Sequence, residues 1–234
     1  MEETSARVEP RRPGPGNELV AAAFLVAAWL AAMFLAAGTL RWKFGWLYVG
    51  VTGIGLVGHH LFVASRNPEM TRRRSGIGPG TRTWDIVWLV VFWPFMMSIP
   101  VVAGVATVRL GQQLMPAWVA IPGVAMFASG MIVSAASMVA NRFFEGTARI
   151  QADQRVVDRG PYAVVRHPGY AGLALWALSG PMLLRSTAAF VPALATAGWV
   201  VIRTVLEDRM LRVELPGYAE YARRVRYRLV PRFW

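Results

Sequence analysis

The sequence predicts an all-α, polytopic membrane protein with about six transmembrane helices, on the strength of three observations. Of the 234 residues, 55% are hydrophobic and only 16% are charged, against about 25% charged residues in an ordinary soluble domain. Apolar stretches close to the length of about 20 residues that crosses a bilayer recur along the chain. Basic residues, which give a formal net charge of +12, are concentrated in alternate segments between these stretches. This composition excludes a disordered chain, and the absence of cysteine excludes disulfides and thiolate chemistry.

The apolar stretches predict six spans. The first of them contains no charged residue, and the second contains two adjacent histidines. Arg185 and Ser186 separate the last two, which predicts a tight helical hairpin there, with one long bent helix as the alternative. The predicted spans cover residues 19–40, 44–64, 86–108, 118–140, 170–184 and 187 to about 202.

The distribution of basic residues predicts the orientation of the chain. Alternate segments hold 21 of them and the intervening connections hold 4, which is the asymmetry expected of cytoplasmic against external loops. Both termini are therefore expected in the cytoplasm, with residues 1–18 as a disordered tail and residues 65–85 as a cytoplasmic loop within the four-helix region 19–140. We expect the basic surplus to face membrane lipids rather than nucleic acid. A composition rich in Ala, Arg and Gly favours a bacterial source, and hence a bacterial inner membrane.

A polar segment, residues 141–168, precedes the fifth predicted span and ends in Arg166, His167 and Pro168. Proline suits the first position of a helix because its missing N–H would be unpaired there anyway. The next three amides, of residues 169–171, are expected to be unsatisfied and to attract a carboxylate or phosphate. The alternative is a capped helix at the membrane surface whose arginines face lipid headgroups.

Charged residues follow the sixth predicted span. Arg203 and Glu207 are four residues apart, so they share one helical face, either as a simple intrahelical salt bridge or as part of a site facing the bundle interior. Residues 217–231 combine aromatic and basic side chains, which is typical of an amphipathic helix on the membrane or of a lid over a site.

The second predicted span carries two further features. His59 and His60 could bind a metal or relay protons, but the chain offers few other ligands nearby, so a hydrogen-bonded histidine facing the bundle is favoured and no metal is expected. A stripe of small residues is expected to let another helix approach closely, and it comprises Gly50, Gly53, Gly55 and Gly58.

The polar segment and the carboxyl-terminal region resemble the isoprenylcysteine carboxyl methyltransferase family of membrane-embedded enzymes. The resemblance rests on GPYAVVRHPGYAG (160–172), RTVLEDRML (203–211) and GYAEYARRVRYRLVP (217–231). It covers roughly residues 141–234, which it identifies as a catalytic region with a polar cofactor loop, a helical hairpin and an amphipathic carboxyl-terminal segment. It implies an integral membrane methyltransferase that uses S-adenosyl-L-methionine.

The resemblance also implies roles for individual residues. Arg203 would orient the methyl acceptor, and Glu207 would contact the cofactor and serve as the candidate base. The remaining cofactor-binding residues implied are Gln151, Gln154, Arg155, Val156, Val157, Tyr162, His167, Pro168, Gly169 and Tyr170. The acceptor could be a prenylcysteine-type carboxylate, a lipid amine or a thiol.

Two other functions are compatible with the sequence. An NADPH-dependent membrane reductase of sterols or lipids shares part of the arginine-histidine-proline string, but Gly169 and Leu173 stand where reductases are expected to carry Asn and an acidic residue. A non-catalytic membrane scaffold or transporter would use the charged clusters for folding alone. A soluble-type methyltransferase is excluded because the sequence contains no strand that is followed by a glycine-rich loop and a helix.

Overall fold

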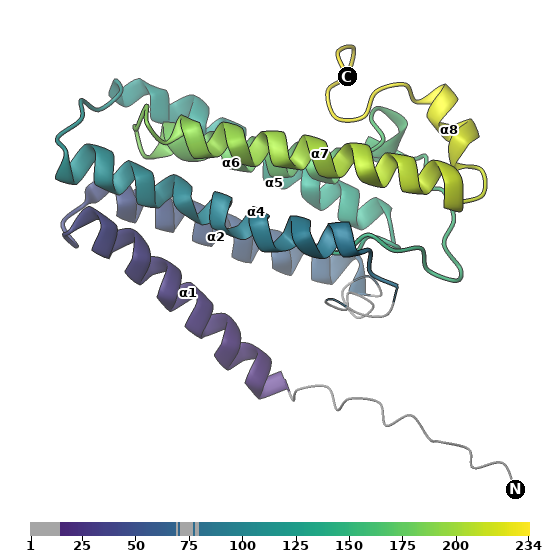
Figure 1. Ribbon diagram of the computed structural model, residues 1–234, viewed down its shortest axis with the longest axis horizontal. Coiled ribbons are helices and arrows are strands. Elements are labelled where there is room, and N and C mark those ends of the chain that lie inside the picture. Colours follow the sequence, from purple (N-terminus) through teal and green to yellow (C-terminus); the bar gives the residue numbers. More distant parts are fainter. Residues whose placement is uncertain (1–14, 69, 71–76, 78–79) are drawn as a thin grey trace, which may run out of the picture.

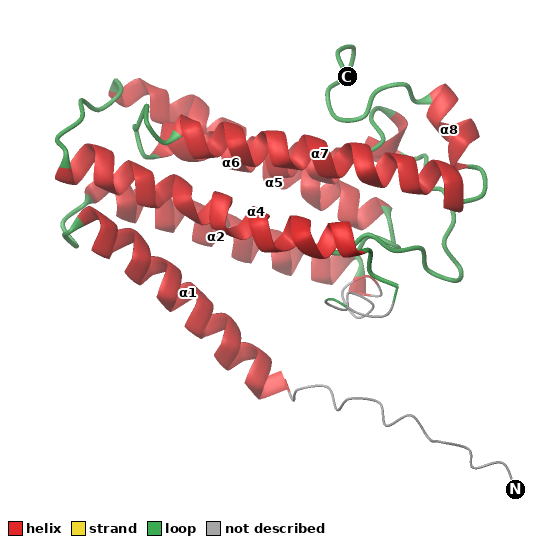
Figure 2. Cartoon of the chain, viewed as in Figure 1, coloured by secondary structure: helices red, strands yellow, loops and turns green. Residues whose placement is uncertain are grey.

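The computed structural model describes residues 15–68, 70, 77 and 80–234, with side chains from residue 24 onward. In these residues the chain forms helices and loops without a strand (Figure 2). A π-helical turn, Val105–Arg109, continues α4, and two 3-10 turns, Ala117–Val119 and Gly160–Ala163, precede α5 and α6. The long α-helices are α1 (Pro15–Ala37), α2 (Lys43–Arg66), α4 (Thr83–Gly104), α5 (Ala120–Ala140), α6 (Pro168–Leu183) and α7 (Phe190–Glu214). They are followed by the short helix α8 (Tyr218–Arg224).

Five of these helices, α2, α4, α5, α6 and α7, run side by side as an elongated bundle, and α1 leaves the bundle at an angle (Figure 1). The helix α8 lies against the end of the bundle where α7 finishes. One apolar core joins the long helices, with Trp88, Ile99 and Leu183 almost completely buried in it, and a separate cluster joins the end of α7 to Tyr218 and Tyr221 of α8. Many large apolar side chains point outward instead, for example Ile54, which is 79% exposed. That distribution suits a bundle whose outer surface contacts lipid.

Four helical segments of the described chain are long and apolar enough to cross a membrane: residues 43–66, 83–109, 117–140 and 190–214. The protein is therefore an all-helical integral membrane protein, as the sequence predicts. The helix α6 is shorter, with 16 residues, and in α1 the apolar part with described side chains is Phe24–Ala37.

The predicted spans correspond to the observed helices, with two corrections of their bounds. The first helix begins at Pro15, so the predicted tail of residues 1–18 is too long; residues 1–14 lie outside the described part. The last helix continues past the predicted end of the span near Ile202, through the helical face shared by Arg203 and Glu207, to Glu214. Two of the charged residues in this continuation have buried partners, because Arg203 pairs with Asp85 and Asp208 pairs with Arg166. The helices α6 and α7 form the predicted hairpin, with a turn at residues 184–189.

Small residues bring α5 and α6 into close contact. A Cβ atom added at Gly130 would stand 2.7 Å from the carbonyl oxygen of Gly172, and one added at Gly172 would stand 2.6 Å from that of Gly130. The stripe expected on α2 behaves differently. A Cβ at Gly55 would meet the ring of Phe127, but Gly50, Gly53 and Gly58 have open space beside them among the described residues, so the expected close helix is wrong at these three positions.

Candidate functional site

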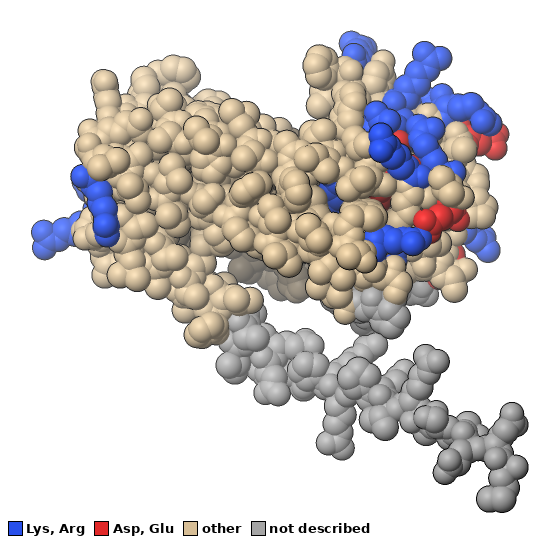
Figure 3. Space-filling model, in the orientation of Figure 1, with Lys and Arg blue, Asp and Glu red and all other residues tan. Residues whose placement is uncertain are grey.

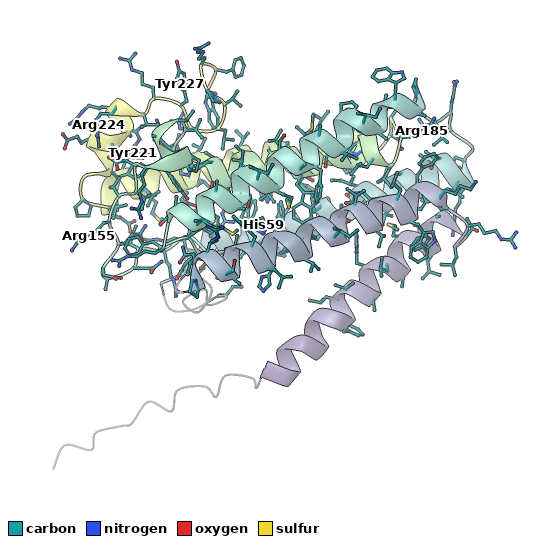
Figure 4. The ribbon with its side chains drawn as sticks, turned by 180° about the vertical axis from the view of Figure 1, so that it is seen from behind. His59, Arg155, Arg185, Tyr221, Arg224 and Tyr227 are labelled. Carbon is teal, nitrogen blue, oxygen red and sulfur yellow. The ribbon has the colours of Figure 1, made fainter. Side chains whose placement is uncertain are left out.

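A polar cavity lies at the α8 end of the bundle, between the loop that follows α5, the start of α6, the last turns of α7, and α8 itself. It encloses about 790 Å³, part of which is open to solvent. Tyr218 and Tyr221 of α8 line it, so the carboxyl-terminal segment acts as the lid that the sequence left as one of two alternatives. Figure 4 shows Tyr221 and Arg155 at this end and Arg185 at the other.

The cavity collects most of the residues that the family resemblance implied. Nine of them line it: Gln154, Arg155, Val156, Val157, Tyr162, His167, Gly169, Tyr170 and Glu207. Gln151 and Pro168 are not among the described lining residues. The Gln151 side chain instead donates to the carbonyl of Phe143, 3.0 Å away, and Pro168 begins α6. Arg203 lies outside this cavity as well.

The start of α6 corrects the expected anion site for two of its three amides. The amides of Tyr170 and Ala171 are not unsatisfied, because both donate to the carbonyl of His167, at 3.1 and 3.2 Å. The Arg166 guanidinium does not face an open anion site either; it is 4% exposed and donates to Asp208 and to the carbonyls of Val225 and Arg226. The helix start therefore anchors the carboxyl-terminal segment.

Asp208 is the centre of this anchoring cluster. Its carboxylate, 1% exposed, contacts the guanidinium groups of Arg166, Arg212 and Arg228 at 2.7, 3.1 and 3.2 Å. It also accepts a hydrogen bond of 3.0 Å from the Tyr218 hydroxyl, and the His167 ring stands within 3.2 Å of the same hydroxyl. Two residues that line the cavity, His167 and Tyr218, are thus held by one buried carboxylate that does not itself line it.

Three tyrosines of this region have pKa values raised above the ordinary value. Burial raises the pKa of Tyr162, and burial together with the nearby Asp208 carboxylate raises the pKa of Tyr218. Burial also raises the pKa of Tyr221, whose hydroxyl donates to the carbonyl of Tyr162 over 2.7 Å. Neutral hydroxyls can donate, so the Tyr218 hydroxyl suits its carboxylate partner.

Tyr170 and Glu207 form the contact that connects α6 and α7 inside the site. The Tyr170 hydroxyl donates to a carboxylate oxygen of Glu207. Glu207 lines the polar cavity, and its side chain is 21% exposed. Tyr170 also lines a second cavity, so the pair stands at the boundary between the two.

The second cavity is mainly apolar and lies among α2, α4, α5, α6 and α7. It encloses about 990 Å³, open space included. Leu56 of α2 and Trp93 of α4 line it and are also 38% and 50% exposed, which places part of its wall at the side of the bundle. His59 lines it too, within 3.2 Å of Ser134, and Figure 4 shows this histidine among the helices. The two cavities share Phe144, Glu145, Gly169 and Tyr170.

Arg203 lines the apolar cavity and is held there by a residue that the sequence analysis missed. Its Nε stands 2.9 Å from Oδ1 of Asp85, and its Nη2 donates to Oδ2 over 3.2 Å. The contact with Glu207, four residues on, is longer at 4.0 Å. Asp85 is completely buried and also accepts the amide of Ala148, which lines the polar cavity.

Asp85 and Asp208 carry little signal in the sequence. Asp85 is the last residue of the predicted loop 65–85, more than 100 residues before its partner, and Asp208 looks like one more charge beside Glu207. A single acidic residue at the start of an apolar stretch could have indicated Asp85, since charges there usually have a buried partner.

The fold and the site together define a helical membrane protein with adjoining polar and apolar cavities near one end. Residues 121–213 match the model of the isoprenylcysteine carboxyl methyltransferase family. This match covers less than half of the chain and supports a relationship to this family of membrane methyltransferases.

A solved structure, that of the eukaryotic intramembrane Ras methyltransferase ICMT, is similar over 92% of this chain and 85% of its own, with 15% identity and a TM-score of 0.45. None of the curated proteins matches the sequence.

Proposed function

We propose that the protein is an S-adenosyl-L-methionine-dependent methyltransferase that binds its cofactor in the polar cavity and a lipophilic or small acceptor in the apolar one. The observation that carries this proposal is the shared wall: Tyr170 and Gly169 line both cavities, so two ligands could meet there without leaving the protein. Transfer between two bound groups depends chiefly on such alignment and on exclusion of water.

The residues of the polar cavity fit this cofactor. Glu207 offers a carboxylate to an ammonium or sulfonium group. Of the three lining arginines, Arg149 and Arg166 are paired with Glu145 and Asp208, whereas Arg155 is exposed and can hold a carboxylate. Apolar and aromatic side chains complete the wall and suit an adenine ring: Phe143, Val156, Val157, Tyr162 and Leu211.

When bound, S-adenosyl-L-methionine would supply a methyl group carried on a sulfonium. The methyl group is transferred without the electron pair of the C–S bond, which stays on sulfur. The protein itself would position the reacting groups. Tyr170 fixes Glu207 at the boundary between the two cavities, and Asp85 fixes Arg203 in the wall of the apolar cavity. Tyr218 and Tyr221 cover the cavity and limit access of water.

We place the polar cavity on the cytoplasmic side. Figure 3 shows basic side chains gathered at the α8 end of the molecule and only a few at the opposite end, the distribution that favours retention of an end in the cytoplasm. The helix α1 finishes at the opposite end of the bundle (Figure 1), and both termini are proposed to be cytoplasmic. A bacterial inner membrane is the proposed location.

Calorimetric titration of the detergent-purified protein with S-adenosylhomocysteine, the demethylated cofactor, tests the proposal. We expect binding in the micromolar range and a loss of at least about tenfold in affinity, or about 1.4 kcal/mol, in Glu207→Gln. Glu214→Gln is the matched control, because Glu214 ends α7 in a partly exposed pair with Arg82. Binding of NADPH in place of the demethylated cofactor would move the protein to the reductases.

A further inference from the structure

The residues that follow α8 form a surface suited to the headgroups of anionic lipids. We propose that this carboxyl-terminal loop, residues 226–234, docks on the bilayer surface and thereby holds the α8 lid over the polar cavity. The docking is independent of the catalytic function, whereas its effect on cofactor binding rests on the function proposed above. Four features of the loop carry this inference: its position, its exposed apolar side chains, its unpaired arginines and its connection to the lid.

The loop is fixed at the level where α6 begins. The amides of Arg166 and His167, directly before α6, donate to the carbonyls of Tyr227 and Arg228, both at 2.9 Å. Because α6 has no charged residue along its 16 residues, its first turn marks one edge of the apolar bundle. From there the loop projects away from the side of the bundle, across the direction of the helices (Figures 1 and 4). In a bundle that spans a bilayer, this direction runs along the membrane surface.

The tip of the loop presents apolar side chains outward. Phe233 is 86% exposed and Val230 is 50% exposed, whereas Leu229 between the tip and the protein is buried. Hydrogen bonds close the turn, because the three amides of residues 228–230 donate to the carbonyl of Trp234 at 2.9, 3.0 and 3.1 Å. An aromatic and an aliphatic side chain exposed on a hydrogen-bonded turn, at the edge of a membrane bundle, are suited to insertion among lipid headgroups.

The arginines around this tip complement anionic headgroups. Residues 221–234 contain five arginines and no acidic residue. Arg224 pairs with Asp158, and Arg228 pairs with Asp208. The other three are exposed and have no acidic partner among the described residues: Arg223, Arg226 and Arg232. Figure 3 shows the basic side chains gathered at this end of the molecule. Anionic lipids would compensate this charge, which zwitterionic lipids leave unbalanced.

The loop is connected to the lid through the protein as well as along the chain. Tyr218 and Tyr221 of α8 line the polar cavity, and α8 leads directly into the loop. Arg228 of the loop contacts Asp208 at 3.2 Å, and the same carboxylate accepts a hydrogen bond of 3.0 Å from the Tyr218 hydroxyl. A surface that binds the loop in this position favours the closed lid, so it raises the affinity for a ligand enclosed beneath the lid. We therefore expect anionic lipid to strengthen cofactor binding.

A fluorescent label on the protein in nanodiscs tests the docking directly. The chain contains no cysteine, so Phe233→Cys and Ala219→Cys each provide one attachment site, and Ala219 is the control because it is exposed on α8. The nanodiscs contain phosphatidylcholine with or without about one third phosphatidylglycerol, and with the anionic lipid we expect acrylamide to quench the label at 233 at least about threefold less than the label at 219. Equal quenching of the two labels would overturn the inference.

Titration of S-adenosylhomocysteine into the same nanodiscs tests the effect on the lid. We expect phosphatidylglycerol to raise the affinity at least about fivefold in the unsubstituted protein, and to have almost no effect when Arg226→Gln and Arg232→Gln are combined. The matched control combines Arg41→Gln and Lys43→Gln, which removes two exposed charges at the opposite end of the bundle and should keep the gain. A gain that survives in the first pair of substitutions would contradict the role of the loop.

The remaining outcomes separate the parts of the inference. Soluble glycerol phosphate, added to phosphatidylcholine nanodiscs, should leave the affinity unchanged, and an equal gain from it would indicate a site for free phosphate instead of a lipid surface. Protection of the label at 233 without any gain in affinity would contradict the connection between loop and lid. Absence of S-adenosylhomocysteine binding in every nanodisc would contradict the proposed function, while the label at 233 still decides the docking.

Discussion

At the scale of single residues, the site depends on two buried carboxylates: Asp85, which holds Arg203, and Asp208, which holds three arginines, two of them from outside α7. Asp85 fixes Arg203 and also accepts the amide of Ala148, so it connects both cavities. Asp208 gathers three arginines and Tyr218 around one side chain. Buried ion pairs are costly to break because the remaining charge is left without a partner.

Removing the Asp208 carboxylate should therefore destabilise the protein strongly. In Asp208→Ala, Arg166 would stay buried with its charge unpaired, and we expect a loss of about 3–5 kcal/mol of unfolding free energy. Chemical denaturation in detergent measures it. The control is Asp158→Ala, which removes an exposed pair with Arg224 and should cost less than about 1 kcal/mol. Equal effects of the two substitutions would contradict the central role of Asp208.

Stability should also fall at alkaline pH. The pKa values of Tyr162, Tyr218 and Tyr221 are raised above the ordinary value of about 10. Above this pH the unfolded chain loses the tyrosine protons while the folded protein retains them, so unfolding becomes more favourable as the pH rises toward the folded-state values. Thermal unfolding at a series of alkaline pH values measures the loss of stability. The absorbance of tyrosinate in the same samples reports the ionisation of the tyrosines. Titration of all tyrosines near pH 10 without unfolding would contradict it.

At the scale of helices, the contact between α5 and α6 sets the position of the site. The helix α6 begins with the residues that line both cavities, and its place depends on the close approach of Gly130 and Gly172. Glycine at such positions allows close backbone contact between membrane helices.

An added methyl group at this crossing should push the helices apart. Gly172→Ala places a carbon atom 2.6 Å from a backbone oxygen, and we expect a loss of about 1–3 kcal/mol in unfolding free energy. Gly50→Ala is the matched control, because open space surrounds Gly50 in the middle of α2 and alanine favours a helix. Thermal unfolding compares the stability of the two variants. A Gly172→Ala variant as stable as the unsubstituted protein would show that the helices cross less closely than described.

At the scale of the whole molecule, the carboxyl-terminal segment completes the polar cavity. Residues 217–234 bring Tyr218 and Tyr221 over the cavity, and their backbone pairs with the start of α6: the amides of Arg166 and His167 donate to the carbonyls of Tyr227 and Arg228, both at 2.9 Å. This segment therefore belongs to the proposed cofactor site, although it follows the last long helix.

Deletion of residues 217–234 should abolish binding of S-adenosylhomocysteine while the bundle persists. The core around Trp88 and Leu183 contains no residue of the deleted segment, so the helical circular dichroism should change little. Calorimetry and circular dichroism on the same preparation measure the two effects. Undiminished binding by the shortened protein would place the cofactor elsewhere.

The sequence by itself determined the helical membrane architecture, because length and hydropathy fix where apolar helices can form whatever their neighbours are. It also identified nine of the residues that line the polar cavity, through motifs that lie close together in the chain. Only the tertiary structure decided the extent of α7, the position of α8 over the polar cavity, and the partners of the Arg166 and His167 amides. It alone placed Asp85 beside Arg203, because pairing across 118 residues depends on how α4 packs against α7 and leaves no local pattern. Helix formation is encoded locally, whereas the choice of partner for a buried charge is made by packing.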